Sequence, residues 1–137
     1  MPRQKTYTFR SAFELTTALW LGCRDIRYEF EEYAYEYDFP IPHGWCPACS
    51  AAHVVRTRTY LCDFTFPRRD WVLEAKGKLD RDERAKFLAI KDAGVEVRFV
   101  FQRNNKLYPK SKTRYSNWCE RHGFEYAIGA PDVRWFQ

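Results

Sequence analysis

The sequence predicts a fold of mixed α/β class (α+β, with a mixed sheet). Its helices pack on the sheet, and the element order is α-β-β-β-α-β-α-β. Three observations lead to this prediction. Several segments alternate apolar and polar residues, or are continuously apolar, and end at turn-forming residues as strands do. Others carry apolar residues at helical spacing behind a capping residue. The 137 residues, 45% of them hydrophobic, fit one compact domain and leave no room for a second.

The first element is a helix that begins at Ser11, after a basic and polar arm over residues 1–10 that we expect to be flexible. Ser11 and Glu14 form an S-x-x-E capping box, which can satisfy free backbone donors at a helix start. The apolar positions that recur at helical spacing before the helix ends near Arg24 are Phe13, Leu15, Ala18, Leu19 and Trp20. The helix opens a single domain over residues 11–137.

A long strand candidate occupies residues 27–39, where the alternation of aromatic residues changes phase after Glu31 and Glu32. A bulge or bend near Glu31 would explain the change, and Pro40 and Pro42 end the strand.

The rest of the chain continues the alternation of strands and helices. Asp80 with Glu83 resembles a second capping pair, and Gly94 and Gly123 stand where helices end. The predicted elements are a strand over 54–66, a turn at 68–70, a strand over 71–76, a helix over 80–94, a strand over 95–102, a helix over 114–123 and a strand over 124–128. The short turn makes its two flanking strands a hairpin.

This hairpin carries the residues with chemical potential. Glu74 and Lys76 are two residues apart on a strand and project from one face, and the turn can bring Asp63 beside Glu74. Two converging carboxylates can hold Mg²⁺, and a lysine beside them can orient a water or stabilise charge on a phosphate. The set suits hydrolysis of a phosphodiester. The alternative is a solvated pair on a strand edge, since E-x-K is a common pattern.

Positive charge is in moderate excess, with 23 Lys and Arg against 18 Asp and Glu, a net charge of +5 and a pI near 9.0. This favours a polyanionic partner, although a basic protein without a charged ligand has the same composition. The residues that we expect to contact DNA phosphates are Arg3, Lys5 and Arg10 on the arm, and Lys106, Lys110, Lys112 and Arg114 in a second cluster. Either cluster can instead be a solvated basic face.

Membrane insertion and secretion are not expected. No apolar run is long enough to span a bilayer, and the N-terminal segment lacks a hydrophobic signal region. The five cysteines show no spacing typical of a disulfide framework. We therefore expect a protein of the reducing cytoplasm.

A loop insertion over residues 43–55 contains the pattern H-x-x-C-x-x-C-x-x-x-H. Four nitrogen and sulfur ligands at this compact spacing can close a tetrahedral structural Zn²⁺ site. These ligands are His43, Cys46, Cys49 and His53. The C-x-x-C pair can instead take partners from elsewhere, Cys62 included, or consist of unligated thiols.

Short motifs follow one another from Phe9 to Gly123, within a stretch that extends to Trp135. They are Phe9-Arg10-Ser11 with Glu14, Phe39-Pro40-Ile41-Pro42, Asp63-Phe64, Glu74-Ala75-Lys76-Gly77, Arg98-Phe99-Val100-Phe101, Lys106-Leu107-Tyr108, and Tyr115 to Cys119-Glu120-Arg121-His122-Gly123. In this order and spacing they resemble the phage endonuclease I family, T-seven-type Holliday-junction resolvases of the PD-(D/E)xK nuclease superfamily. This likeness is far more specific than the three hairpin residues alone.

The resemblance implies a restriction-endonuclease-like core and a Mg²⁺-dependent endodeoxyribonuclease of four-way junctions and other branched DNA, with Mn²⁺ as a substitute ion. Asp63 and Glu74 match the family's metal-binding carboxylates, and Lys76 matches its catalytic lysine. Glu14 matches a carboxylate from the first helix, where residue patterns alone favour a helix cap.

The family also implies an intertwined, domain-swapped homodimer. The helix and long strand of residues 11–42 would bridge to the partner, and Glu14 would complete the other subunit's active centre. An ordinary sheet strand with a bulge is the simpler interpretation of the same segment.

Two departures from the family pattern stand out. Cys62 replaces the proline of the PD motif, and we expect its side chain to point away from the metal. The Cys/His loop is longer than the family's. Two rival functions remain: a related nuclease that cuts ordinary duplex DNA, as restriction or transposase enzymes do, and a non-catalytic zinc-containing nucleic-acid-binding module.

Overall fold

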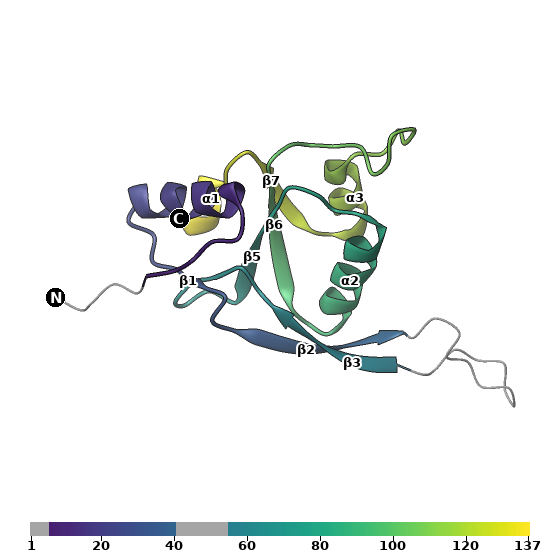
Figure 1. The fold of residues 1–137 in the computed structure, drawn as a ribbon, viewed down its shortest axis with the longest axis horizontal. Helices are drawn as coiled ribbons and strands as arrows, with labels where there is room; N and C mark the ends of the chain where they lie inside the picture. Colours follow the sequence, from purple (N-terminus) through teal and green to yellow (C-terminus); the bar gives the residue numbers. More distant parts are fainter. Residues whose placement is uncertain (1–5, 41–54) are drawn as a thin grey trace, which may run out of the picture.

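The computed structural model describes residues 6–40 and 55–137 (Figure 1). Its helices are α1 (Ala12–Cys23), α2 (Arg81–Asp92), α3 (Tyr115–His122) and the 3-10 helix η1 (Val133–Phe136). Its strands are β1 (Glu29–Phe30), β2 (Ala34–Pro40), β3 (Val55–Leu61), β4 (Phe64–Thr65), β5 (Trp71–Lys76), β6 (Glu96–Phe101) and β7 (Glu125–Ile128). None of these helices is long and apolar enough to cross a membrane.

The prediction of a mixed sheet is confirmed. A five-stranded sheet has the order β1-β4-β5-β6-β7, antiparallel from β1 to β5 and parallel from β5 to β7. β2 and β3 form a separate antiparallel pair, in register from Ala34 opposite Leu61 to Pro40 opposite Val55. This pair extends away from the five-stranded sheet in Figure 1.

Two predicted strands are each divided in the structure. The bend predicted near Glu31 is confirmed, whereas the continuous strand predicted over residues 54–66 is wrong. The stretch 27–39 breaks at Glu31, whose φ of 51° is left-handed, and the stretch 54–66 breaks at Cys62 and Asp63. Each half then joins a different sheet, because the chain turns at the break. The Glu31 N–H donates to the Asp63 carbonyl over 2.9 Å, which fastens the two breaks together. With the halves rejoined, the predicted element order is recovered and η1 is added at the end.

Helices cover both faces of the five-stranded sheet (Figure 1). Strand β6 shows the division, because Phe99 and Phe101 pack with α2 and α3 while Val100 between them packs with α1 and η1. Phe87 of α2 is fully buried in the core on one face of the sheet, and Leu21 of α1 is fully buried in the core on the other face. The resulting core holds the ends of β4 and β5 rigidly between layers.

The buried face of α1 differs from the prediction at two positions. Phe13 and Ala18 are buried as expected, but Leu15 and Leu19 are 45% and 59% exposed. Thr17 and Leu21 take their places in the core. Because helical spacing defines more than one stripe, only the packing partner selects the stripe that is buried.

The described part of the predicted arm is held against the core. The ring of Tyr7 lies 5.9 Å from that of Tyr28, and the ring of Phe9 lies 4.6 Å from that of Phe30. These contacts fix Arg10 and the start of α1 next to strand β1.

Candidate active site

The structure brings Asp63, Glu74 and Lys76 together at one end of the hairpin. β4 pairs with β5 through Phe64 opposite Leu73, which places Asp63 level with the second half of β5. An Asp63 carboxylate oxygen accepts a hydrogen bond from the Ala75 N–H over 3.0 Å. The local turn therefore produces the convergence that the residue spacing predicts.

Glu74 is held by two donors in a buried position, with 4% of its surface exposed. The Tyr60 hydroxyl donates to its Oε2 over 2.5 Å, and the Lys76 Nζ lies 3.4 Å from its Oε1. Burial raises the pKa of Glu74, while Lys76 and the Tyr60 hydrogen bond oppose this rise. The carboxylate is thus oriented with little freedom.

Lys76 lies between two carboxylates. Besides Glu74, its Nζ contacts the Glu83 carboxylate of α2 at 2.8 Å. Burial alone would lower the pKa of Lys76, but Glu74 and Glu83 outweigh it and raise that pKa above its ordinary value. The side chain is therefore a cation at neutral pH, suited to stabilising negative charge rather than accepting a proton.

The surroundings of Asp63 disfavour the ionised form of its carboxyl group. Burial, and then the nearby Glu74 and Glu14, raise the pKa of Asp63 to about 8, while the Ala75 hydrogen bond and Lys76 act in the opposite direction. A buried carboxylate of this kind binds either a proton or a cation near neutral pH.

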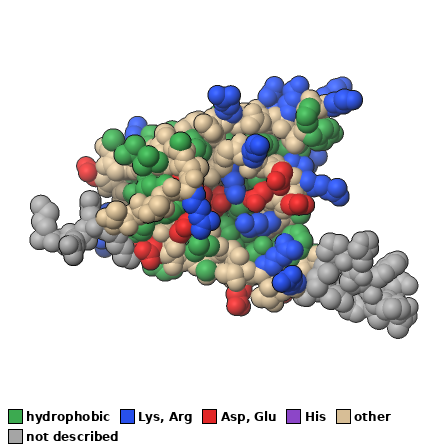
Figure 2. All heavy atoms as spheres, in the orientation of Figure 1, with side chains coloured by type: hydrophobic (Ala, Val, Ile, Leu, Met, Phe, Trp, Pro, Cys, Tyr) green, Lys and Arg blue, Asp and Glu red, His purple; other side chains and the backbone are tan. Residues whose placement is uncertain are grey.

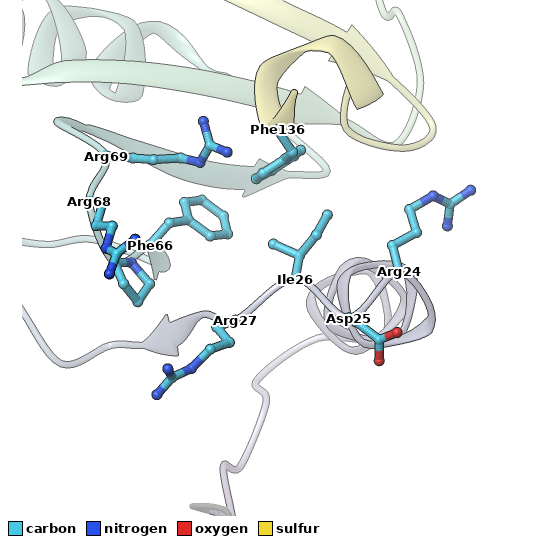
Figure 3. A pocket seen from close by; sticks show the side chains of 9 residues that line it. Arg24, Asp25, Ile26, Arg27, Phe66, Arg68, Arg69 and Phe136 are labelled. Atoms are coloured by element: carbon cyan, nitrogen blue, oxygen red, sulfur yellow. The ribbon is translucent and has the colours of Figure 1, made fainter.

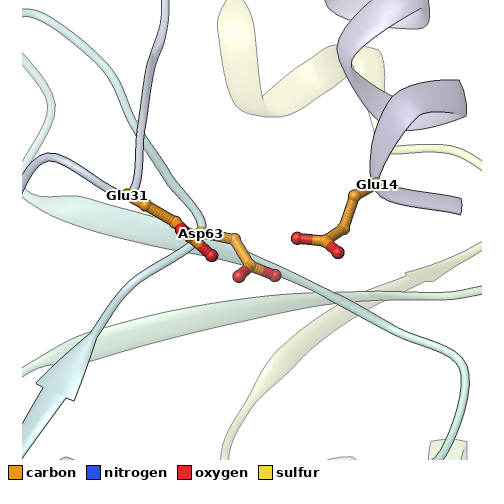
Figure 4. Close-up of side chains that lie close together, drawn as sticks. All are labelled: Glu14, Glu31 and Asp63. Atoms are coloured by element: carbon orange, nitrogen blue, oxygen red, sulfur yellow. The ribbon is translucent and has the colours of Figure 1, made fainter. Parts of the chain in front are cut away.

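Glu14 reaches Asp63 of its own chain. Ligand oxygens of Glu14, Glu31 and Asp63 all lie within 4.8 Å of one another, on α1, on the link from β1 to β2, and just before β4 (Figure 4). Ser11 accepts from the Glu14 N–H over 3.1 Å, as predicted for a cap, but the Glu14 carboxylate points toward Asp63. Its predicted place in a partner's active centre concerns a dimer and stays a prediction.

The donor set suits Mg²⁺ or Mn²⁺. All the converging side-chain groups are carboxylates, which hard divalent ions prefer, and no thiol or imidazole joins this group among the described residues. The surplus charge around Asp63 gives a cation a favourable place.

Three residues of the site were not predicted as site members. In the sequence, Tyr60 is one of the alternating residues of a predicted strand. Glu31 lies where the alternation of another strand changes phase, and Glu83 is the second residue of a predicted capping pair. The Asp80 side chain does accept from the Glu83 N–H over 2.9 Å, while the Glu83 carboxylate pairs with Lys76. The phase change was the one sequence signal that pointed to Glu31.

Cys62, which replaces the proline of the PD motif, is buried against the strand end. Its Sγ donates to the Tyr33 carbonyl over 3.2 Å, and burial, followed by nearby Glu74, raises the pKa of its thiol to about 12. A thiol in this state is a poor metal ligand. The predicted zinc ligands lie outside the described residues; they are His43, Cys46, Cys49 and His53.

Basic side chains gather over the loop between β6 and α3 in Figure 2. Exposed members of this cluster are Lys106, Lys110, Lys112 and Arg114. The Arg114 guanidinium also donates to the Asn104 carbonyl over 2.8 Å, which fixes the loop. Arg10 pairs with Glu31 at 3.3 Å, whereas Arg3 and Lys5 lie outside the described residues.

A separate pocket of about 500 Å³ lies between the end of α1, the β4–β5 turn and η1 (Figure 3). Its arginines are Arg24, Arg27, Arg68 and Arg69, around an apolar floor of Ile26, Phe66 and Phe136. Two of these arginines have structural roles, since Arg24 lies 4.0 Å above the Trp20 ring and Arg69 donates to the Trp135 carbonyl over 2.9 Å. None of the four predicted catalytic residues lines it.

The hydrogen bond from Tyr60 to Glu74 should have a measurable role. We expect Tyr60→Phe to lower the free energy of unfolding by about 1–3 kcal/mol at neutral pH, because a buried carboxylate loses a donor. Urea denaturation measures the change. Tyr37→Phe, at another buried tyrosine of the β2–β3 pair, is the matched control; an equal loss in both variants would contradict the special role of Tyr60.

Comparison with known proteins shows which family the chain is similar to. The family model described as "Phage endonuclease I" matches residues 2–137. The chain is 31% identical over 137 residues to "Endonuclease I" of Escherichia phage T7, covering 98% of this chain and 82% of the relative. It is 32% identical over 122 residues to "Endodeoxyribonuclease 1" of Enterobacteria phage T3, covering 87% of this chain and 70% of the relative.

Proposed function

Because the chain belongs to the phage endonuclease I family, we propose that it is a structure-selective endodeoxyribonuclease that resolves four-way (Holliday) junctions and other branched DNA. The observation that carries this proposal is the convergence of Asp63, Glu74 and Lys76, the residues to which the sequence resemblance assigns the family's metal-binding and catalytic roles. The relatives from phages T7 and T3 are named as an endonuclease and an endodeoxyribonuclease, which supports DNA as the substrate.

The reaction is hydrolysis of a phosphodiester with Mg²⁺, for which Mn²⁺ substitutes. Asp63, Glu74 and Glu14 are the carboxylates that would hold the ion. Mg²⁺ bound there would supply a Lewis acid that polarises the phosphate and makes water a better nucleophile. The layered core and the Asp63 bond to Ala75 keep these oxygens in place before the substrate arrives.

Lys76 acts as a fixed positive charge in this proposal. Its raised pKa keeps it protonated, and its contacts with Glu74 and Glu83 aim the ammonium at the hairpin end. It can hydrogen-bond a phosphate oxygen or the attacking water and so stabilise the charge that develops during cleavage. Glu83 and Tyr60 are positioning residues, because they act through Lys76 and Glu74.

A homodimer would supply the two active sites that a symmetric junction requires. The exposed apolar side chains of Leu15 and Leu19 on α1, and of Tyr33 and Leu61 near the β2–β3 pair, support a partner surface on these elements. The basic loop between β6 and α3 supports contact with DNA phosphates. We place this activity in the cytoplasm of a bacterial host, where phage DNA is processed.

Junction selectivity is tested with two substrates of the same sequence, a four-way junction and its matching linear duplex. With Mg²⁺ we expect the junction to be cut at least about tenfold faster, because branch geometry rather than base sequence would be recognised. Single-turnover cleavage rates give the comparison. Equal rates would instead favour a duplex nuclease of the same fold.

A further inference from the structure

We propose that Glu31 is an additional metal-binding carboxylate of this centre, and that Arg10 occupies it in the metal-free chain. The inference rests on the proposed nuclease function. It adds a ligand and an ion-pair exchange that neither the sequence motifs nor the family match assigns.

The position of the Glu31 carboxylate is the first observation that supports the proposal. Ligand oxygens of Glu31 lie within 4.8 Å of those of Glu14 and Asp63, and Figure 4 shows the three carboxylates directed toward one another from separate elements. The Glu31 N–H donates to the Asp63 carbonyl over 2.9 Å, so the two backbones are fixed relative to each other. Glu74 is not one of these three closely spaced carboxylates, and its oxygens contact Tyr60 and Lys76.

Glu14 supplies an independent sign of a ligand. Its residue is 7% exposed, and its carboxylate makes no hydrogen bond or ion pair with the described residues. It is aimed at Asp63 and Glu31 (Figure 4). Carboxylates this close together repel one another, and a divalent cation between these three groups offsets that repulsion.

Arg10 is the cation that a metal ion would replace on the Glu31 carboxylate. Its guanidinium contacts Glu31 at 3.3 and 3.4 Å, yet its side chain is 73% exposed, while that of Glu31 is 21% exposed. An ion pair so open to water is weak, so a divalent ion can displace the arginine. Freed from Glu31, Arg10 lies beside the metal centre, where a phosphate of bound DNA would take the place of its lost partner.

Two variants of this one ion pair should have opposite effects on Mn²⁺ binding by the full chain, followed by calorimetry or by the electron paramagnetic resonance of free Mn²⁺. Glu31→Gln should weaken binding by about tenfold or more, because a ligand charge is lost. Arg10→Ala should tighten binding by about two- to fivefold, because a competing cation is removed. Arg10→Ala should also weaken DNA binding.

The exposed neighbour provides the control, since Glu32→Gln removes one negative charge next to the cluster and should change Mn²⁺ affinity by less than about twofold at moderate salt. Weakened binding in both Arg10→Ala and Glu31→Gln would mean that the pair is only structural, and would overturn the proposal. So would unchanged binding in Glu31→Gln. If binding is unchanged there while Asp63→Asn abolishes it, the proposed nuclease survives and only the role of Glu31 fails.

Discussion

Glu74→Ala should reduce junction cleavage by about three orders of magnitude or more while leaving junction binding close to that of the wild type. Glu74 would hold the metal and also positions Lys76, whose Nζ lies 3.4 Å from it, so both parts of the chemistry are lost together. DNA affinity depends mainly on basic side chains away from this carboxylate, and therefore persists. Gel-based cleavage and binding of one labelled junction measure both quantities.

A matched control is available on β7. Glu125 is exposed on the sheet edge strand, so Glu125→Ala should leave cleavage within about twofold of the wild type. Cleavage by Glu74→Ala at a rate similar to that of this control would remove Glu74 from the active centre. Loss of binding together with cleavage would point instead to a damaged fold, which thermal denaturation would show.

Asp63→Asn should stabilise the metal-free protein above pH 8. The pKa of Asp63 is raised to about 8 in the folded chain, against an ordinary value of 3.8. The folded state therefore binds the proton more tightly than the unfolded state, and stability falls as pH rises from about 4 to about 8. Asparagine does not ionise, so the variant does not lose this stability. The loss in the wild type is on the order of a few kcal/mol of unfolding free energy above pH 8.

The measurement is urea denaturation in chelator at pH 5 and pH 8.5. The stability difference between Asp63→Asn and the wild type should be larger at pH 8.5, with the exposed Asp92→Asn as a control that shows no such trend. Mg²⁺ should stabilise the wild type at pH 8.5 and not Asp63→Asn. A wild type whose stability rises between these two pH values relative to the variant would contradict the raised pKa.

Sequence reasoning works best here for local geometry. The short turn and the pairing of β4 with β5 are enough to place Asp63 beside Glu74, since both are set by residues close in the chain. Helix caps at Ser11 and Asp80 are equally local, and both form.

Features that depend on contacts between residues far apart in the chain could not be predicted from the sequence. Leu15 and Leu19 have helical spacing, but the sheet beneath α1 selects another stripe. The break at Glu31 showed as a change of phase, yet its left-handed φ and its position beside Asp63 arise from packing between separate elements. Glu83 reaches Lys76 only because α2 crosses back over the sheet after β5.

The central claim is that this carboxylate centre hydrolyses DNA with a divalent metal ion. The most direct test is a titration of Mg²⁺ into chelator-treated wild-type protein, with cleavage of a four-way junction followed at each concentration. No cleavage is expected in chelator, with activity returning as Mg²⁺ or Mn²⁺ is added. Undiminished cleavage in chelator, or none at any concentration of either ion, would contradict the claim.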